Sequence, residues 1–171
     1  MVFDNKRIDK ILIDMQSDLM QFMQDADISS PVVVGIHSGG VLVARRLHAA
    51  MDLEEEMGEL NSGFYRDDFS SHGLKAQLKP SVMPLSVEGR HIILVDDVLY
   101  SGRTVRGAMN ELFDYGRPAS ITLAVLIDRG NRELPIEAQV VGVKHLLGPD
   151  EYLQVTGPDQ LEMSIIRREH N

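Results

Sequence analysis

Apolar and polar positions along this chain follow two different periodicities. Near the N-terminus the apolar residues recur every three or four positions, which is the spacing of a helix that buries one face. The positions that follow this rule are Ile8, Ile11, Leu12, Met15, Leu19, Phe22 and Met23. Asp4 or Asn5 is the candidate N-terminal cap, because short polar side chains accept hydrogen bonds from the free N–H groups of a first turn. The pattern therefore predicts an amphipathic helix at the start of the chain.

Further along, short continuous apolar runs alternate with helical patterns. Such runs are typical of strands that are buried on both faces of a sheet. They span residues 32–36, 92–95, 121–127 and 140–143, with further strand candidates at 59–64, 152–155 and 163–166. Helical patterns cover residues 41–51 and 105–115, and Gly116 and Pro118 stop the second one. Strands that alternate with helices predict an α/β fold with a mainly parallel sheet and helices on both of its faces.

The polar stretch from Asp67 to Pro80 interrupts this alternation. It contains Gly73 and shows weak periodicity, so we expect a long mobile loop, a kind of segment that often has a function. No repeat, low-complexity tract or linker divides the chain. We therefore expect residues 1–171 to form a single domain.

Composition excludes several classes of protein. The 171 residues are 43% apolar and 25% charged, as in an ordinary globular protein, and no apolar run reaches the ~20 residues of a membrane span. The N-terminus lacks a signal-peptide core, so we expect a cytoplasmic location. There is no cysteine, which excludes a disulfide framework and a thiolate site. A net charge of -9 does not favour nucleic-acid binding, although it does not exclude a local basic patch.

The segment from His91 to Thr104 carries the strongest chemical signal. Its apolar run is followed by Asp96 and Asp97, where we expect the strand to end, and then by the turn Ser101–Thr104. Ligands of open α/β sheets bind outside the carboxyl ends of the strands. The acids can hold a sugar diol or a hydrated magnesium ion, and the N–H groups of the turn can hold a phosphate. Each feature alone is common in ordinary loops, but the ordered combination predicts a site for a ribose 5-phosphate.

A second strand–loop–helix unit lies earlier in the chain. The run 32–36 leads into His37-Ser38-Gly39-Gly40 and then into a helical pattern. The two glycines allow a ligand to approach the backbone closely. A Gly-Gly pair after a strand is often only a tight turn, so both interpretations stay open, and we favour the binding role.

Three segments together carry a resemblance to a known family. The 91–104 segment resembles the phosphoribosyl-pyrophosphate (PRPP) motif of type I phosphoribosyltransferases. With YRDDFS (65–70) and GRPASITLAVLIDRGNRELPIEA (116–138), it resembles the PyrR family of pyrimidine-operon attenuators and uracil phosphoribosyltransferases. The similarity spans about residues 30 to 145. It implies the type I phosphoribosyltransferase fold, with a mainly parallel central sheet flanked by helices and a small hood over the base.

The resemblance also implies an activity and its partners. Uracil and PRPP would give UMP and pyrophosphate with Mg²⁺ as cofactor, and the chain would form a homodimer or a higher homo-oligomer. Two alternatives stay open: an RNA-binding attenuation regulator with little or no catalysis, and a salvage phosphoribosyltransferase for another base. No membrane partner is expected.

Roles for individual residues follow from the resemblance. Asp96 and Asp97 would bind the ribose hydroxyls and hold magnesium through water, and Arg66 is a third catalytic candidate, which could instead pair with a neighbouring acid. The implied residues for the 5-phosphate are Tyr100, Ser101, Gly102, Arg103 and Thr104. Those for pyrophosphate are Ser38, Gly39 and Gly40, and those for the base are Arg129, Val141 and Val143.

Two further residues bear on the choice among these activities. Tyr100 stands where purine phosphoribosyltransferases usually carry an acid, which favours a pyrimidine. Arg132 and Lys144 are the candidate RNA contacts, but Glu137 stands where arginine is common in the family. Because an added carboxylate repels a phosphate backbone, we predict weak or no binding of pyrimidine leader RNA.

Overall fold

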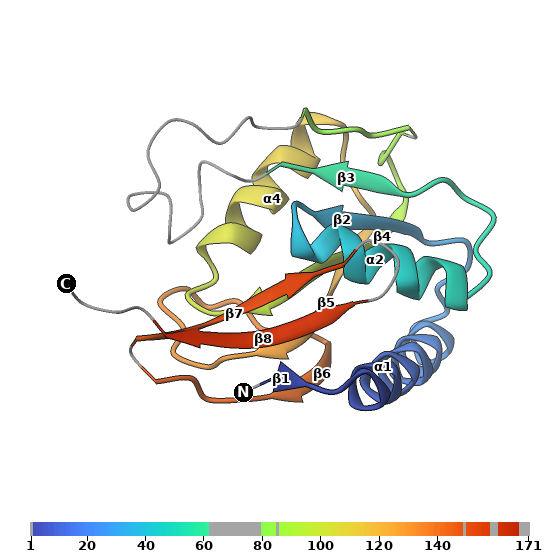
Figure 1. Ribbon diagram of the computed structural model, residues 1–171. Coiled ribbons are helices and arrows are strands. Elements are labelled where there is room, and N and C mark those ends of the chain that lie inside the picture. Colours follow the sequence, from blue (N-terminus) through green and yellow to red (C-terminus); the bar gives the residue numbers. More distant parts are fainter. Residues whose placement is uncertain (1, 62–79, 85, 149, 158–160, 168–171) are drawn as a thin grey trace.

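The computed structural model describes residues 2–61, 80–84, 86–148, 150–157 and 161–167 (Figure 1). The predicted strand at 59–64 is confirmed at residues 59 and 60, and its residues 62–64 lie outside the described residues, as do Arg66 and nearly all of the predicted mobile loop at 67–80. The elements in chain order are β1 (Val2–Phe3), α1 (Asn5–Asp25), β2 (Val32–Ile36), α2 (Gly39–Ala50), β3 (Gly58–Leu60), β4 (His91–Leu99), α4 (Arg103–Asp114), β5 (Ser120–Asp128), β6 (Val140–Lys144), β7 (Glu151–Thr156) and β8 (Glu162–Arg167).

A five-stranded sheet in the order β3-β2-β4-β5-β6 forms the centre of the molecule. Every neighbouring pair in it is parallel, which confirms the prediction made from the apolar runs. The central strands are buried on both faces because helices cover both sides, and this is why their sequences are apolar throughout.

Two clusters of buried side chains fill the two sides of this sheet. One cluster joins residues of α1 and α2 to one face, and the other joins residues of α4 to the opposite face. The predicted helices are confirmed, and the second and third begin two residues earlier than predicted, at Gly39 and Arg103. Asp4 caps α1, since its Oδ1 accepts a hydrogen bond from the Arg7 N–H at 2.7 Å.

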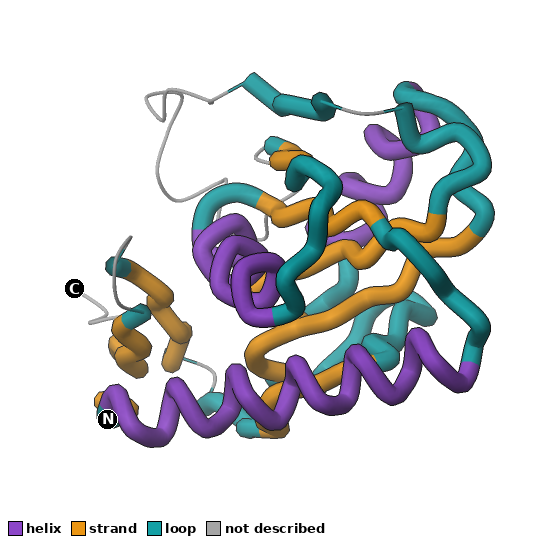
Figure 2. The backbone as a smooth tube through the Cα atoms, turned by 90° about the vertical axis from the view of Figure 1, so that its right-hand side faces the viewer, coloured by secondary structure: helices purple, strands orange, loops and turns teal. Residues whose placement is uncertain are grey.

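Strands β1, β7 and β8 form a separate antiparallel sheet in the order β1-β8-β7, which we call the small sheet. Its buried residues Val155 and Met163 belong to the same cluster as α1 and α2, so the small sheet packs on that side of the molecule. Figure 2 shows it beside the N-terminal end of α1. Within the described parts of the chain, no helix combines the length and apolar character needed to cross a membrane.

Candidate functional site

The carboxyl edge of the central sheet brings the two predicted loops together. β4 pairs with β2 only as far as Val95, opposite Gly35, but it pairs with β5 as far as Leu99, opposite Asp128. The expectation that the strand ends at its acids is therefore wrong, because β5 runs alongside and extends it. What ends just before the acids is the pairing with β2, and this frees one edge of β4 at that point.

Asp96 and Asp97 are both buried, with 3% and 9% of their surfaces exposed. The Asp97 N–H donates to Asp96 Oδ1 at 2.9 Å, and the Val98 N–H donates to Asp97 Oδ1 at 3.0 Å. Buried carboxylates are costly unless they are hydrogen-bonded or paired with a cation. Here each carboxylate accepts a backbone hydrogen bond, which offsets part of that cost.

The loop His37–Gly40, which we call the Gly-Gly loop, lies directly against these acids. A Cβ placed on Gly39 would stand 2.0 Å from Asp97 Oδ2, and one on Gly40 would stand 2.7 Å from the Val95 carbonyl oxygen. Both glycines are buried and form the first residues of α2, whereas Ser38 is exposed and makes no side-chain capping bond. The glycines are therefore required by the contact with β4, beyond any role in a turn.

The turn Ser101–Thr104 leads from β4 into α4. The Ser101 side chain is fully buried, and its Oγ accepts a hydrogen bond from the Arg103 N–H at 3.3 Å. Gly102 has φ +92°, a conformation that side-chain-bearing residues rarely adopt, and it stands at the N-terminus of α4. Two helix N-termini, those of α2 and α4, thus follow loops at the same sheet edge. Helix N-termini favour anions.

The connection between β5 and β6 packs over this turn. The Ser101 carbonyl oxygen accepts hydrogen bonds from the Glu133 and Leu134 N–H groups, both at 3.0 Å. The Arg103 guanidinium forms an ion pair with Glu133 at 2.8 Å, and both side chains are about half exposed. The Arg103 side chain is thus paired within the protein, and the sequence pattern gives no sign of Glu133 as its partner.

Arg132 is the centre of a partly buried network, with its side chain 15% exposed. Its guanidinium pairs with Asp128 at 2.8 Å and donates to the carbonyl oxygens of Ile136 at 2.9 Å and Tyr100 at 3.1 Å. These bonds tie the end of β5 to the end of β4, so they hold the turn in place. Lys144, the other candidate RNA contact, is exposed at the end of β6.

Arg129, a predicted base-binding residue, contacts Tyr100, a predicted 5-phosphate-binding residue. Its guanidinium carbon lies 4.2 Å from the centroid of the Tyr100 ring, in cation–π contact. Its terminal nitrogen donates to the Gly148 carbonyl oxygen at 3.3 Å, in the connection towards β7. Val141 and Val143 on β6 are half-buried and pack against different core clusters, so their side chains do not form one surface.

The carboxylate oxygens at the sheet edge are suitable ligands for a hard cation. Among the described residues, no group of three or more histidine, cysteine or carboxylate side chains could hold a metal ion by itself. Mg²⁺ usually keeps several waters and takes one or two carboxylates together with substrate phosphates. The oxygen ligands of Asp96 and Asp97 fit that mode of binding.

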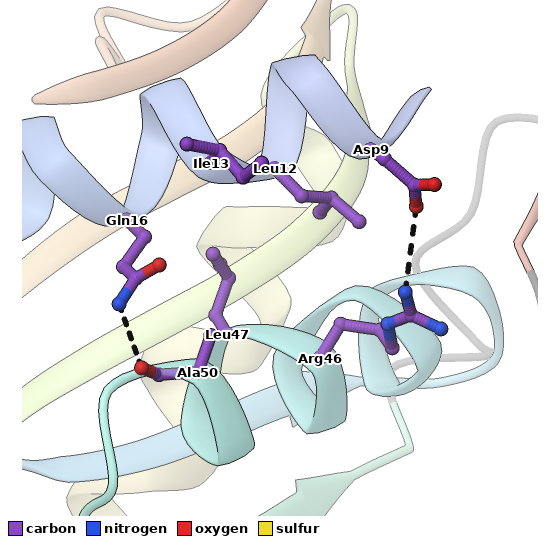
Figure 3. A pocket seen from close by; sticks show the side chains of 7 residues that line it. All are labelled: Asp9, Leu12, Ile13, Gln16, Arg46, Leu47 and Ala50. Carbon is purple, nitrogen blue, oxygen red and sulfur yellow. Dashed lines mark hydrogen bonds and ion pairs between the residues drawn. The ribbon is translucent and has the colours of Figure 1, made fainter. Parts of the chain in front are cut away.

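A pocket of about 350 Å³ opens elsewhere, between α1 and α2 (Figure 3). Ile13 and Leu47 are among its lining residues, and two polar contacts join the helices there, from Arg46 to Asp9 and from Gln16 to the Ala50 carbonyl oxygen. None of the site residues predicted from the sequence lines this pocket.

Comparisons with known proteins agree with the geometry. The family model "Phosphoribosyl transferase domain" matches residues 3–161. A "Bifunctional protein PyrR" of Nitrosococcus oceani is 52% identical over 160 residues, which cover 92% of this chain and 90% of that protein. One of Pseudomonas aeruginosa is 49% identical over 154 residues, which cover 90% of this chain and 91% of that protein.

Solved structures share the fold at lower sequence identity. The hypoxanthine phosphoribosyltransferase of Trypanosoma cruzi superposes with a TM-score of 0.69 at 18% identity and covers 98% of this chain and 95% of its own. A hypoxanthine-guanine phosphoribosyltransferase of Bacillus anthracis superposes with a TM-score of 0.68 at 19% identity, and the match covers 90% of this chain and 88% of that one. At such identities the likeness shows the fold alone.

Proposed function

Since the chain belongs to the phosphoribosyl transferase domain family, and within it to the PyrR proteins, we propose that it transfers a phosphoribosyl group from PRPP to uracil. UMP and pyrophosphate are the products. The observation that carries this proposal is the packing of Gly39 against Asp97, with the Ser101–Thr104 turn following the same strand. This junction offers adjacent positions for a ribose, a 5-phosphate and a pyrophosphate.

Each part of the junction has a role in the proposed reaction. The carboxylates of Asp96 and Asp97 accept hydrogen bonds from the ribose hydroxyls. The turn and the N-terminus of α4 hold the 5-phosphate, through backbone N–H groups between Tyr100 and Thr104. Ser38, Gly39 and Gly40 supply backbone N–H groups to the pyrophosphate. Breaking the C1–pyrophosphate bond builds negative charge on the leaving group, and fixed donors stabilise that charge without reorganising.

A bound magnesium ion would belong at the same place. Asp96 and Asp97 would hold it through water, together with oxygens of PRPP. When bound, the ion supplies positive charge that the acidic chain lacks at the leaving pyrophosphate. The protein itself contributes the orientation of the two carboxylates.

The base would lie between the ends of β5 and β6 and the small sheet, which we infer to be the hood. Arg129 and the backbone of Val141 and Val143 would border it there. The contact of Arg129 with Tyr100 and with the Gly148 carbonyl oxygen supports a link between this region and the turn. Uracil N1–H is fairly acidic, so a dedicated general base is less needed for the loss of that proton.

Wider properties of the protein are part of the same proposal. The shared core of the central and small sheets supports a single domain over residues 1–171. We infer a cytoplasmic homodimer or higher oligomer. Regulatory RNA binding is the second candidate function, because the relatives are named bifunctional. Arg132 is engaged inside the protein, so Lys144 would be the more accessible of its two candidate contacts.

The test is PRPP consumption and pyrophosphate release by the purified protein with Mg²⁺ and four bases in parallel. Uracil should support turnover, whereas hypoxanthine, guanine and orotate should not. Turnover with another base and none with uracil would favour the salvage alternative. No turnover with any base would favour the purely regulatory one.

A further inference from the structure

A chain of three polar side chains from three elements fixes the outer side of the Gly-Gly loop. The His37 Nε2–H donates to Glu59 Oε2 at 2.9 Å, and the Arg45 guanidinium pairs with Glu59 Oε1 at 2.6 Å. Glu59 lies on β3 and Arg45 on α2, so one carboxylate connects the loop, the edge strand and the helix that begins at the loop. The sequence pattern shows His37 at the start of the loop but gives no sign of its partner.

The register of the sheet explains why these side chains meet. Glu59 stands opposite Gly35 in the parallel pair of β2 and β3, and residues 35 and 37 are two positions apart. Side chains two apart on an extended chain point to the same face. The His37 N–H also donates to the Leu60 carbonyl oxygen at 2.8 Å, so the ladder continues for one residue past the end of β2.

The contacts differ in how far water screens them. The side chains of His37 and Glu59 are 12% and 20% exposed, whereas Arg45 is 56% exposed. Charge-assisted hydrogen bonds that are shielded from water contribute more than exposed ion pairs. The bond between His37 and Glu59 should therefore carry most of the effect. The bond requires an imidazole that carries a proton on Nε2, because the carboxylate can only accept.

The Gly-Gly loop needs such an external support. Gly39 and Gly40 have no side chains of their own to hold them, and Gly39 must stay against Asp97. We propose that Glu59, acting through His37, is a positioning residue that sets the affinity of the Gly-Gly loop for the pyrophosphate group of PRPP. Neither side chain needs to touch the substrate. This inference rests on the proposed function, because it assigns pyrophosphate to that loop.

The test separates ligands that carry pyrophosphate from those that do not. The measurements are the KM values for PRPP and uracil, and the Kd values of magnesium pyrophosphate and UMP by calorimetry. His37→Ala and Glu59→Ala should each raise the KM for PRPP and the Kd for pyrophosphate ~10-fold, the loss of one good charge-assisted hydrogen bond. The KM for uracil and the Kd for UMP should stay within about 2-fold of wild type, since UMP lacks the group that the loop binds.

Conservative variants and a matched control sharpen the result. His37→Gln keeps an N–H donor of similar reach and should recover most of the affinity. Combining His37→Ala with Glu59→Ala should add little to either change alone, because both remove the same bond. The control is Glu55→Ala. It removes another half-buried carboxylate, which forms an ion pair with Arg90 at a distance of 2.7 Å and is not part of the loop or its support. This change should leave all four constants unchanged.

Unchanged affinity for PRPP and pyrophosphate in His37→Ala would overturn the proposal. An equal loss of UMP affinity would also overturn it, since that would mean general damage to the fold. If Glu59→Ala does not fold, the affinities of His37→Ala and His37→Gln for PRPP and pyrophosphate still test the proposal. If the wild type shows no turnover with any base, the proposed function fails, whereas the calorimetric pyrophosphate constants still test the role of the loop support.

Discussion

Gly39 and Asp97 are in such close contact that no side chain fits at position 39. A Cβ there would lie 2.0 Å from Asp97 Oδ2 and 2.5 Å from its carboxyl carbon. Gly39 begins α2 and Asp97 lies near the end of β4, so the contact joins two strand–loop–helix units that are 58 positions apart in sequence. The carboxylate and the backbone of the loop are thereby fixed relative to each other.

Gly39→Ala should displace the carboxylate or the loop. We expect pyrophosphate release to fall ~100-fold, because a shift of about 1 Å at a reacting group can cost that much. The free energy of unfolding should fall by about 1–3 kcal/mol, as for other overpacked sites. The control is Gly58→Ala on β3, where the new Cβ would stand 2.7 Å from the sulfur of the flexible Met83 side chain and 3.3 Å from a Val34 methyl group. Equal activities of the two variants would contradict the account.

Much of the fold could be predicted from periodicity, because the buried strands and amphipathic helices carry strong local signals. The runs at 92–95 and 121–127 are β4 and β5, and the helix after Asp4 is α1. The end of β4 could not be predicted in this way. It depends on β5, a strand that lies distant in sequence and supports β4 beyond Asp97 to Leu99.

Arg132 should matter for stability more than for any external contact. Arg132→Ala leaves Asp128 without its ion pair and removes bonds to the Ile136 and Tyr100 carbonyl oxygens. Removing one partner of a buried pair leaves an uncompensated charge, so we expect a loss of about 3 kcal/mol in the free energy of unfolding.

The matched control for Arg132→Ala is Arg103→Ala, which breaks an ion pair of the same length with an exposed partner, Glu133. An exposed pair contributes little, so its loss should cost under about 1 kcal/mol. Urea unfolding of both variants makes the comparison. A smaller loss for Arg132→Ala than for Arg103→Ala would show that the network does not hold the turn.

The candidate site was less predictable than the fold. The acids, the glycines and the turn follow local motifs, and the structure brings them to one edge. The supporting partners Glu59, Asp128 and Glu133 come from other strands and loops, and no local pattern marks them. Such partners depend on the register between strands and on the path of connections, which a single sequence does not specify.

The carboxyl group of Glu151 should titrate below its ordinary pKa of about 4.5. The Gly148 N–H donates to it at 3.0 Å and the Arg167 guanidinium lies 3.0 Å away, and both favour the charged form and lower the pKa. A lowered pKa stabilises the folded state above the ordinary pKa, and that contribution disappears as the pH falls through the folded value. An NMR titration of the Glu151 side-chain carboxyl carbon measures this pKa directly.

Glu151→Gln provides the thermodynamic check. The difference in stability between wild type and variant should be constant at neutral pH and should shrink as the pH drops below about 4.5. A titration midpoint at or above that value would show that the contacts around Gly148 do not hold the carboxylate.

Leader RNA should bind weakly or not at all at physiological salt. The net charge is -9, and Arg132 is already paired inside the protein. A protein that neutralises Z phosphates shows a log–log salt slope near -0.9Z, so few accessible cations mean a shallow slope. The measurement is a titration of labelled pyrimidine leader RNA with UMP at several salt concentrations. Nanomolar affinity with a steep slope would show that an assembled oligomer gathers cations that one chain does not.

The most direct test of the central claim is uracil-dependent pyrophosphate release by Asp96→Asn and Asp97→Asn. Each change keeps the shape of the side chain and removes its charge. We predict that Asp97→Asn lowers the rate by at least ~100-fold, as expected when diol and metal binding are lost together, while the urea unfolding midpoint stays near that of wild type. Near-normal rates in both variants would contradict the assignment of the site.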